Sequence, residues 1–258
     1  MGTKSISIAI AGSGGAGAMT TGNTLFDAAA KVGWYGILSR TVGPQIRGGE
    51  AAAMLRLSTT PRSGPDDYFD VLLAIDWKNI ERFAREIPLN TDSLIICDIK
   101  AGDVPEEIAA TGARILQMPI MATARKVKKG RPNMLALGML AKMIDLPEEI
   151  VASLLEAKLG SKGEQAVQSS LETVKLGWEL ADDLPTLARF ENAAPAAGKR
   201  WVISGNEAAG LGAIRGGVRF VAAYPITPAT EVLEWLAPQL PKVGGTLVQA
   251  EDELSSIN

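Results

Sequence analysis

The sequence predicts an α/β protein: a parallel sheet, then a helical part, then the start of a second α/β unit. Three observations carry this prediction. Short apolar runs alternate with helical patterns to about residue 119, helical patterns continue to about residue 184, and the alternation restarts after residue 200. Strands that alternate with helices pair in parallel, with the helices on the faces of the sheet.

The first predicted domain comprises residues 1–190. Its strands are expected where apolar runs of four to eight residues occur, and its helices where apolar residues recur every three to four positions. The predicted strands are 5–12, 35–40, 51–58, 69–76 and 93–98. The predicted helices are 15–33, 77–87, 121–129, 133–144, 147–160 and 164–184.

Residues 191–200 form a predicted linker, because this stretch is rich in small residues and lacks periodicity. The second predicted domain, residues 201–258, shows a strand, a helix, a strand and a beginning helix at 219–224, 227–239, 245–250 and 251–258. One strand–helix–strand unit is too small to close a core. We therefore expect the natural chain to continue, or this part to dock onto another element.

Composition excludes several classes of function. The 258 residues carry a net charge of −3 and no basic run, which argues against nucleic acid and against an anionic membrane surface. Because neither a signal peptide nor a membrane-spanning run is recognisable, the sequence predicts a cytoplasmic protein. There is one cysteine, Cys97, expected in the core, and no histidine. Catalysis must therefore use carboxylates, hydroxyls, backbone dipoles, a cofactor or another chain.

The stretch GSGGAG at 12–17 follows a predicted strand and opens a predicted helix. It matches G-x-G-x-x-G, in which glycines let the backbone approach a phosphate at a helix N-terminus. The acid expected on the ribose of a dinucleotide is missing, since Arg40 stands near that position. Two interpretations stay open: a tight turn without ligand, or a phosphate site. The candidate glycines are Gly12, Gly14, Gly15 and Gly17.

A second loop, TVGPQIRGGE at 41–50, contains one cation, Arg47. If its strand is parallel to the first strand, the loop lies at the same carboxyl-end edge as GSGGAG. It is either a surface loop with a solvated arginine or a contact for an anion or another subunit.

The stretch YPITPAT at 224–230 stands between a predicted strand and a predicted helix. Pro228 suits the first helical position, which makes Thr227 the expected N-cap. The Thr227 hydroxyl and the following amides would then face the carboxyl edge of the sheet, a place suited to a small carboxylate. The alternative is that Thr227 only caps the helix.

The stretch VQAEDEL at 248–254 places acids at the next junction of strand and helix. We expect Glu251 to end the strand and to face the same edge as Thr227. The alternative is that these acids only stabilise the first turn of the helix through its dipole.

The motifs occur in an order that resembles one family. GSGGAG is followed by GPQIRGGEAAAMLRLS, FDVLLAID, NMLALG, KGE, GNEAAGLGAIRGG, YPITPAT and QAEDE. The sequence resembles the alpha subunit of 2-oxoacid:ferredoxin oxidoreductases in which a gamma domain precedes the alpha domain, and the 2-oxoglutarate type is most similar. The resemblance covers nearly the whole chain, and YPITPAT with QAEDE is its most specific part.

The resemblance implies a fold, a reaction and partners. Residues 1–190 would be the gamma domain, and residues 201–258 the start of the pyrimidine-type half of a thiamine diphosphate fold. The reaction would be oxidative decarboxylation of a 2-oxo acid, such as 2-oxoglutarate or pyruvate, with coenzyme A and ferredoxin. A beta subunit would supply the diphosphate-binding half, Mg²⁺ and a [4Fe-4S] cluster, so the isolated chain is expected to be inactive.

The resemblance also assigns residues. Thr227 would contact the substrate, and Glu251 would bond the aminopyrimidine ring of thiamine diphosphate. Tyr224, Pro225 and Ile226 would line the cofactor. The GSGGAG loop and Arg47 are candidates for contacts with coenzyme A.

The chain departs from the family pattern in length, because the rest of the alpha domain is missing. Two alternatives therefore stay open: a non-catalytic assembly or coenzyme A-binding module, and a nucleotide-binding dehydrogenase, which the missing ribose acid disfavours.

Overall fold

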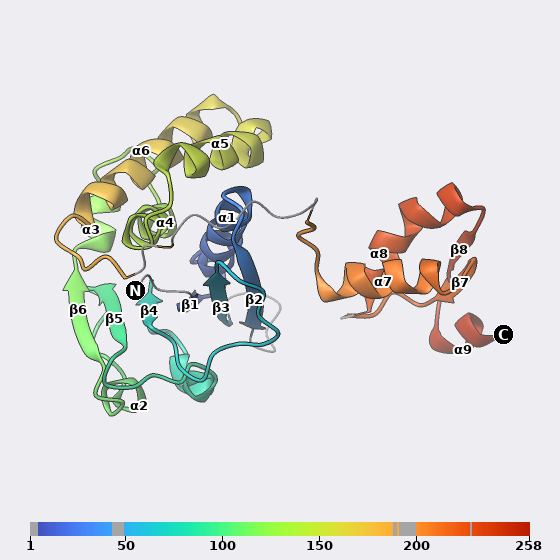
Figure 1. Ribbon diagram of the computed structural model, residues 1–258, viewed down its shortest axis with the longest axis horizontal. Helices are drawn as coiled ribbons and strands as arrows, with labels where there is room; N and C mark the ends of the chain where they lie inside the picture. The colour runs from blue at the N-terminus through green and yellow to red at the C-terminus, as the bar shows by residue number, and fades with distance from the viewer. Residues whose placement is uncertain (1–4, 43–48, 188–189, 191–199, 228) are drawn as a thin grey trace. The chain divides into compact units, whose positions relative to one another are not determined.

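The chain forms two compact units, residues 1–198 and residues 199–258, in a computed structural model (Figure 1). The structure describes residues 5–42, 49–187, 190, 200–227 and 229–258. The division between the units falls inside the range 191–200 that the sequence assigns to a linker. Each unit is described separately below.

The first unit is built on a six-stranded sheet in the order β2-β3-β1-β4-β5-β6. The strands are β1 (Ser5–Ser13), β2 (Tyr35–Val42), β3 (Glu50–Ser58), β4 (Val71–Ala74), β5 (Leu94–Asp98) and β6 (Arg114–Met118). The pairs β1–β4 and β4–β5 are parallel, as predicted, and β5–β6 is parallel as well. The prediction is wrong for β3, which is antiparallel to both β1 and β2. The reason is that no crossover helix separates β2 from β3 in the sequence, and a short connection joins antiparallel strands.

Two further predictions need correction. The strand β6 was not expected, because it is a partly exposed edge strand in which Arg114 and Gln117 interrupt the apolar residues. The predicted helix 77–87 is instead two short 3-10 turns, η1 (Ile80–Arg82) and η2 (Ala84–Glu86). Asn79 at φ 60° and Phe83 at φ −135° break the helical path on either side of η1.

The helices of the first unit are α1 (Ala18–Lys31), α2 (Glu106–Ala109), α3 (Ile120–Ala124), α4 (Pro132–Met143), α5 (Glu148–Leu159) and α6 (Glu164–Leu180), with a 3-10 turn η3 (Gly160–Lys162). The predicted helical part is therefore confirmed in α4, α5 and α6. The predicted helix 121–129 is shorter than expected and ends at Ala124, and the turns that follow place Lys129 at φ 65°.

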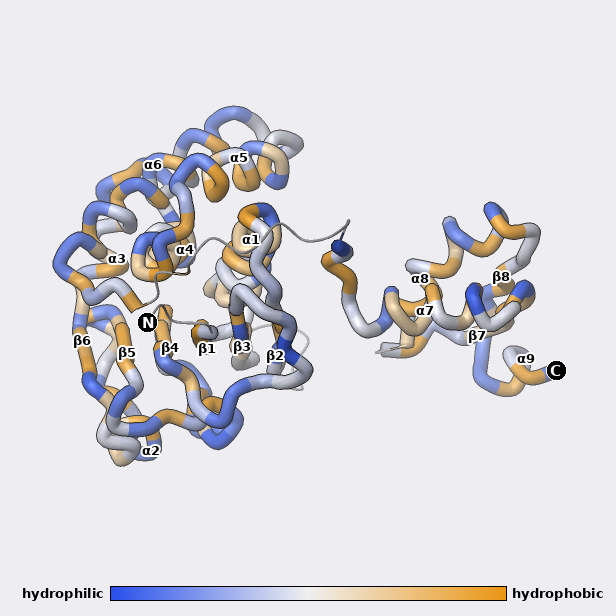
Figure 2. The backbone as a smooth tube through the Cα atoms, viewed as in Figure 1, coloured by the Kyte–Doolittle hydropathy of each residue, from blue (hydrophilic) through white to orange (hydrophobic). Residues whose placement is uncertain are grey.

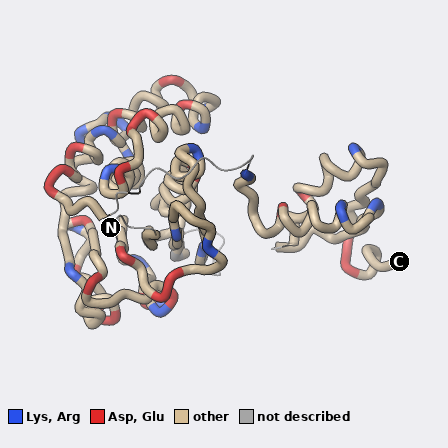
Figure 3. Tube along the Cα trace, viewed as in Figure 1, with Lys and Arg blue, Asp and Glu red and all other residues tan. Residues whose placement is uncertain are grey.

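Each face of this sheet has its own apolar core, because successive side chains of a strand point to opposite faces. Ile6, Ile8 and Ile10 of β1 are buried in the same cluster as residues of α1, α4, α5 and α6. Ala9, Ala11 and Cys97 are buried in a second cluster with Ile80 and Phe83, and Cys97 is a core residue, as predicted. Figure 2 shows hydrophobic residues along the strands and α4, and Figure 3 shows charges on the outer helices α5 and α6.

The second unit contains α7 (Gly205–Arg215), β7 (Phe220–Ala223), α8 (Thr230–Gln239), η4 (Leu240–Val243), β8 (Thr246–Gln249) and α9 (Glu253–Ile257). Its two strands form a parallel pair. Within its described residues, only Gly210, Leu236 and Leu240 are fully buried, which agrees with the expectation that this part cannot close a core. Trp201 is 68% exposed and Phe220 is 65% exposed. No helix in the described ranges is long and apolar enough to cross a membrane.

Candidate functional site

The predicted residues of the second unit leave its sheet at one edge. Ala223, the last residue of β7, pairs with Gln249, the last residue of β8. The Ala250 amide then donates to the Ala223 carbonyl at 3.0 Å, so both chains emerge together. Since the strands are parallel, the segments 224–227 and 250–252 start from the same carboxyl-end edge, the usual ligand-binding edge of an open α/β sheet.

Thr227 is not the helix cap that the sequence predicts. The helix α8 begins at Thr230, and its N-cap position is Ala229, which makes no side-chain cap bond. The Thr230 amide donates to the Ile226 carbonyl at 3.1 Å, so the amide that a Thr227 cap would bond already has a partner. A turn therefore stands between β7 and α8. Within the described ranges, the exposed Thr227 hydroxyl has no hydrogen-bond partner.

The other predicted residues of this stretch line the turn. Tyr224 and Pro225 are half-buried, while Ile226 is 52% exposed. Pro228 lies outside the described residues.

Glu251 lies outside the helix that follows it. Asp252 is the N-cap of α9, where its Oδ1 atom accepts the Ser255 amide at 2.7 Å. That hydrogen bond is the main reason why the pKa of Asp252 is below the usual aspartate value. Asp252, and not Glu251, therefore caps α9. The Glu251 side chain is exposed and has no hydrogen-bond or ionic partner in the described part of the chain.

In the first unit, the glycine loop connects β1 to α1 at the carboxyl-end edge of the sheet. Gly15 and Gly17 have φ values of 98° and 96°, a left-handed backbone that favours glycine. Gly12 is buried and Gly14 is exposed. The loop therefore joins the strand to the helix, as predicted, and this geometry fits both a tight turn without ligand and a phosphate site.

The described residues on either side of 43–48 lie at the same sheet edge as the glycine loop. Glu50, the first residue of β3, pairs with Ser13, and the Gly14 amide donates to the Gly49 carbonyl. The strands β1 and β2 run in the same direction, with β3 between them. The prediction that their carboxyl ends lie at one edge of the sheet required this shared direction. Arg47 itself lies in 43–48, outside the described residues.

Two polar residues beside the glycine loop were missed by sequence reasoning. The Asp76 carboxylate follows β4 and accepts the Ser13 amide at 3.0 Å and the Ser13 hydroxyl at 2.8 Å. Asn133, the second residue of α4, lies against Gly17. Asp76 ends a predicted parallel strand, so its position could have been anticipated. Asn133 is more than a hundred residues from the loop in sequence, and no local signal connects the two.

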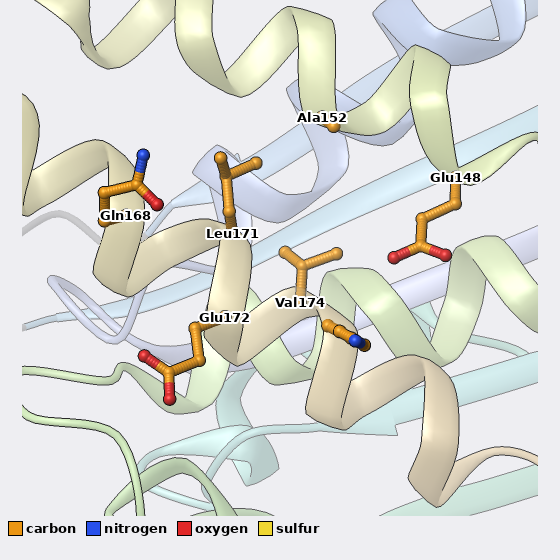
Figure 4. Close-up of a pocket in the computed structure, with 7 residues that line it drawn as sticks. Glu148, Ala152, Gln168, Leu171, Glu172 and Val174 are labelled. Atoms are coloured by element: carbon orange, nitrogen blue, oxygen red, sulfur yellow. The ribbon is translucent and has the colours of Figure 1, made fainter.

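A separate hollow of about 410 Å³ lies between α5 and α6 (Figure 4). Its lining combines Glu148 and Glu172 with Lys175 and with apolar side chains. None of the predicted site residues lines it. The candidate functional residues therefore lie at the two sheet edges, outside this hollow.

Comparison with known proteins identifies the family. The profile "Pyruvate ferredoxin/flavodoxin oxidoreductase" matches residues 7–180, and "Pyruvate flavodoxin/ferredoxin oxidoreductase, thiamine diP-bdg" matches residues 211–258. The chain is 56% identical over 55 residues to the 2-oxoglutarate synthase subunit KorA of Methanocaldococcus jannaschii, a match that covers 21% of this chain and 15% of that protein.

Two solved structures extend the comparison. The 2-oxoglutarate:ferredoxin oxidoreductase of Magnetococcus marinus, solved with 2-oxoglutarate, coenzyme A and succinyl-CoA bound, matches with a TM-score of 0.83 and 37% identity. That match covers 99% of this chain and 45% of that chain. The gamma subunit of a keto/oxoacid ferredoxin oxidoreductase from Geobacter sulfurreducens shares the fold, with a TM-score of 0.52, 21% identity and coverage of 68% of this chain and 98% of that one.

The chain thus spans less than half the length of the Magnetococcus chain, and its match covers 15% of the Methanocaldococcus subunit. One family profile covers most of the first unit, and a second covers most of the second unit. These matches agree with the order of motifs in the sequence. The chain belongs to the pyruvate ferredoxin/flavodoxin oxidoreductase family, as an alpha-type chain of the 2-oxoacid:ferredoxin oxidoreductases.

Proposed function

We propose that this chain is part of a thiamine diphosphate-dependent 2-oxoacid:ferredoxin oxidoreductase. The reaction converts a 2-oxo acid and coenzyme A to an acyl-CoA and carbon dioxide, while two electrons pass to ferredoxin. The proposed substrate is 2-oxoglutarate, because the relatives from Methanocaldococcus and Magnetococcus carry that name. The observation that carries the proposal is the shared edge of β7 and β8, from which the segments with Thr227 and Glu251 both emerge.

The residues present at this edge fit thiamine diphosphate. A hydroxyl and a carboxylate stand exposed after paired parallel strands, and neither has a partner in the described ranges. The bound cofactor would act as an electron sink: it would accept the electron pair left behind when the substrate carboxylate departs as carbon dioxide. Glu251 would hold a proton at a ring nitrogen of the aminopyrimidine, as the acceptor of that N–H.

Thr227 would bind the substrate. Its hydroxyl donates a hydrogen bond, and a carboxylate of a 2-oxo acid is a strong acceptor for such a donor. The turn 224–227 holds the hydroxyl outside α8, so it is available to a ligand. Tyr224, Pro225 and Ile226 would form the apolar wall beside it.

A second polypeptide is needed to complete the pocket, because the edge of this small unit is exposed. We propose a beta subunit that brings the diphosphate-binding half, Mg²⁺ and a [4Fe-4S] cluster. The isolated chain is then inactive. The glycine loop and Arg47 of the first unit are proposed to contact coenzyme A. A cytoplasmic location completes the proposal, since the single cysteine has no second cysteine with which to form a disulfide.

The test uses the intact protein that carries this sequence, assembled with its beta subunit. Reduction of ferredoxin is followed with 2-oxoglutarate or pyruvate, in the presence of coenzyme A, thiamine diphosphate and Mg²⁺. We expect Glu251→Gln to lower kcat about 100-fold or more, in the range typical of lost proton-transfer groups. Glu253→Gln is the matched control, because Glu253 lies in the first turn of α9, and it should change kcat less than twofold.

Thr227→Ala should lower kcat/KM, and Thr227→Ser should restore most of it, since serine keeps the hydroxyl. Melting temperatures of all variants should match that of the wild type, because neither side chain has a bond to lose within the described structure. Full activity of Glu251→Gln, or equal losses in Glu251→Gln and Glu253→Gln, would contradict the proposal.

A further inference from the structure

A hydrogen bond joins the first turns of α7 and α8 in the second unit. The side-chain amide of Asn206 donates to the carboxylate of Glu231, with 2.6 Å between the Nδ2 and Oε2 atoms. Asn206 is half-buried near the start of α7, and Glu231 lies in the first turn of α8. Hydrogen bonds to a charged group are stronger than those between neutral groups. This bond therefore ties the two helix starts to each other.

A second contact shows that the two helices run in the same direction. Gly210 follows Asn206 by one helical turn in α7, and Trp235 follows Glu231 by one turn in α8. A Cβ atom at Gly210 would lie 2.6 Å from the Cε3 atom of Trp235, so the helices are closely packed at this level. Since the two contacts occur in the same order along both helices, the N-termini of α7 and α8 lie side by side (Figure 1).

These N-termini lie at the sheet edge that carries the candidate residues. The helix α8 follows β7 in the chain, so it starts at the carboxyl end of that strand. The start of α7 is beside it, and the end of α7 is joined to the start of β7 by the short connection 216–219. Asn206 is therefore a third polar residue at this edge, with the Thr227 hydroxyl and the Glu251 carboxylate.

The position of the Thr227 hydroxyl depends on the start of α8. Within the described ranges this hydroxyl has no bond of its own, so the backbone that leads into the helix sets its place. The Thr230 amide joins that backbone to α8 through the Ile226 carbonyl. The bond from Asn206 to Glu231 then joins the first turn of α8 to α7. A displacement of that turn would therefore displace the hydroxyl.

Asn206 also directs a negative charge. Because Glu231 lies in the first turn of α8, its carboxylate is at the same edge as Thr227, where the carboxylate of a 2-oxo acid would bind. Like charges repel, so a Glu231 side chain that turned towards the substrate would weaken its binding. The hydrogen bond keeps the Glu231 carboxylate directed towards α7.

We propose that Asn206 is a positioning residue for substrate binding. Through its bond to Glu231 it fixes the first turn of α8, and with it the Thr227 hydroxyl, and it holds the Glu231 charge away from the substrate. This inference rests on the proposed function, in which Thr227 binds the carboxylate of a 2-oxo acid. It adds α7 to the elements that build this edge.

The test uses the intact protein assembled with its beta subunit, and initial rates of ferredoxin reduction are measured over a range of 2-oxoglutarate concentrations. Asn206→Ala should raise KM about tenfold and change kcat less than twofold, because it weakens the binding of substrate and transition state alike. Asn206→Asp should raise KM further, since it places a second carboxylate against Glu231. Gln239→Ala is the matched control, because Gln239 accepts a hydrogen bond from Lys242 at the other end of α8, and KM should not change.

An exchange of the two side chains separates the bond from the residues that form it. The double variant Asn206→Asp with Glu231→Gln places the carboxylate on α7 and the amide on α8, so an N–H···O bond between the helices can form again. Its KM should return to within about threefold of the wild-type value. Calorimetric titration with glutarate gives a readout without turnover, because glutarate has both carboxylates but no oxo group. Its dissociation constant should follow the same order among the variants as KM.

A role in folding alone gives a different pattern. In that case Asn206→Ala would lower the melting temperature and leave both KM and the dissociation constant of glutarate unchanged. That result, or a double variant as impaired as Asn206→Asp alone, would overturn the inference and leave the proposed function standing. Absence of ferredoxin reduction by the wild-type complex would instead refute the proposed function, and this inference with it.

Discussion

Two glycines allow α4 and α6 to pack with their backbones in contact, and replacing one of them should weaken the first unit. A Cβ atom at Gly138 of α4 would lie 2.0 Å from the Val174 carbonyl oxygen. A Cβ atom at Gly177 of α6 would lie 2.1 Å from the Leu135 carbonyl oxygen. Because the colliding atoms belong to the backbone, no side-chain rotation relieves the clash. The helices would have to separate by about 1 Å to reach the 3.0 Å below which Cβ contacts essentially never occur.

Two opposing effects set the change in the free energy of unfolding that Gly138→Ala should cause. Overpacking a core costs about 1–3 kcal/mol, and backbone collisions place Gly138→Ala at the upper end of that range. Alanine is favoured over glycine inside a helix by about 1 kcal/mol, which offsets part of the cost. We expect a net loss of about 2 kcal/mol in the free energy of unfolding. For a unit of this size that loss lowers the melting temperature by roughly 4–8 °C.

The assay is thermal and urea unfolding followed by circular dichroism. Gly160→Ala is the matched control in the same unit, since Gly160 has right-handed helical angles and open space around its Cβ position. It should stabilise the protein by about 0.4–1 kcal/mol. If Gly138→Ala were as stable as Gly160→Ala, the helices would not pack as described and the reasoning would be wrong.

Three other predictions concern ionisable groups. Burial raises the pKa of Asp70 above its ordinary value of 3.8, because the folded state favours the protonated carboxyl. The stability that this protonated carboxyl gives is therefore complete below pH 3.8 and is lost as pH rises through the raised pKa. Asp70→Asn should therefore be more stable than wild type at pH 7, with the difference shrinking towards pH 4; a constant difference in urea titrations would contradict this. The hydrogen bond from the Ser255 amide lowers the pKa of Asp252. The stability that this bond gives is therefore present above the ordinary aspartate pKa and is lost as pH falls through the lowered pKa. Asp252→Ala should accordingly speed hydrogen exchange of the Ser255 amide, measured by NMR, and unchanged exchange would count against the cap. Burial raises the pKa of the Cys97 thiol, which is 0% exposed, so a thiol reagent at pH 8 should label it only after unfolding, and immediate labelling of native protein would refute this.

Much of the fold could be predicted from periodicity, and the errors have physical causes. Strand β4, and strand β5 up to Cys97, are continuous apolar runs, which is the signature of strands buried on both faces. The strand β1 is also buried along its middle, with Ser7 as its one buried polar side chain in 6–11. The edge strand β6 has no such run, because one side of it is exposed. The segment 77–87 has enough apolar residues for a helix, but it buries them through two short turns instead.

The two candidate sites differ in how far sequence could predict them. Thr227 and Glu251 each follow a strand, so parallel pairing alone brings their segments to one edge. The Thr227 cap was mispredicted because local propensity cannot show that a turn precedes α8. Asn133 reaches Gly17 only because α4 packs on α1, which is a tertiary contact between distant segments.

The reversed direction of β3 explains why loops gather at the edge of the first unit. Because β3 is antiparallel to β1, it begins where β1 ends, and Glu50 lies opposite Ser13. A parallel β3 would have carried residues 49–50 to the far edge of the sheet, away from the glycine loop. The described residues at this edge are the end of β2, which pairs with the start of β3, and Gly49, whose carbonyl accepts the Gly14 amide of the glycine loop.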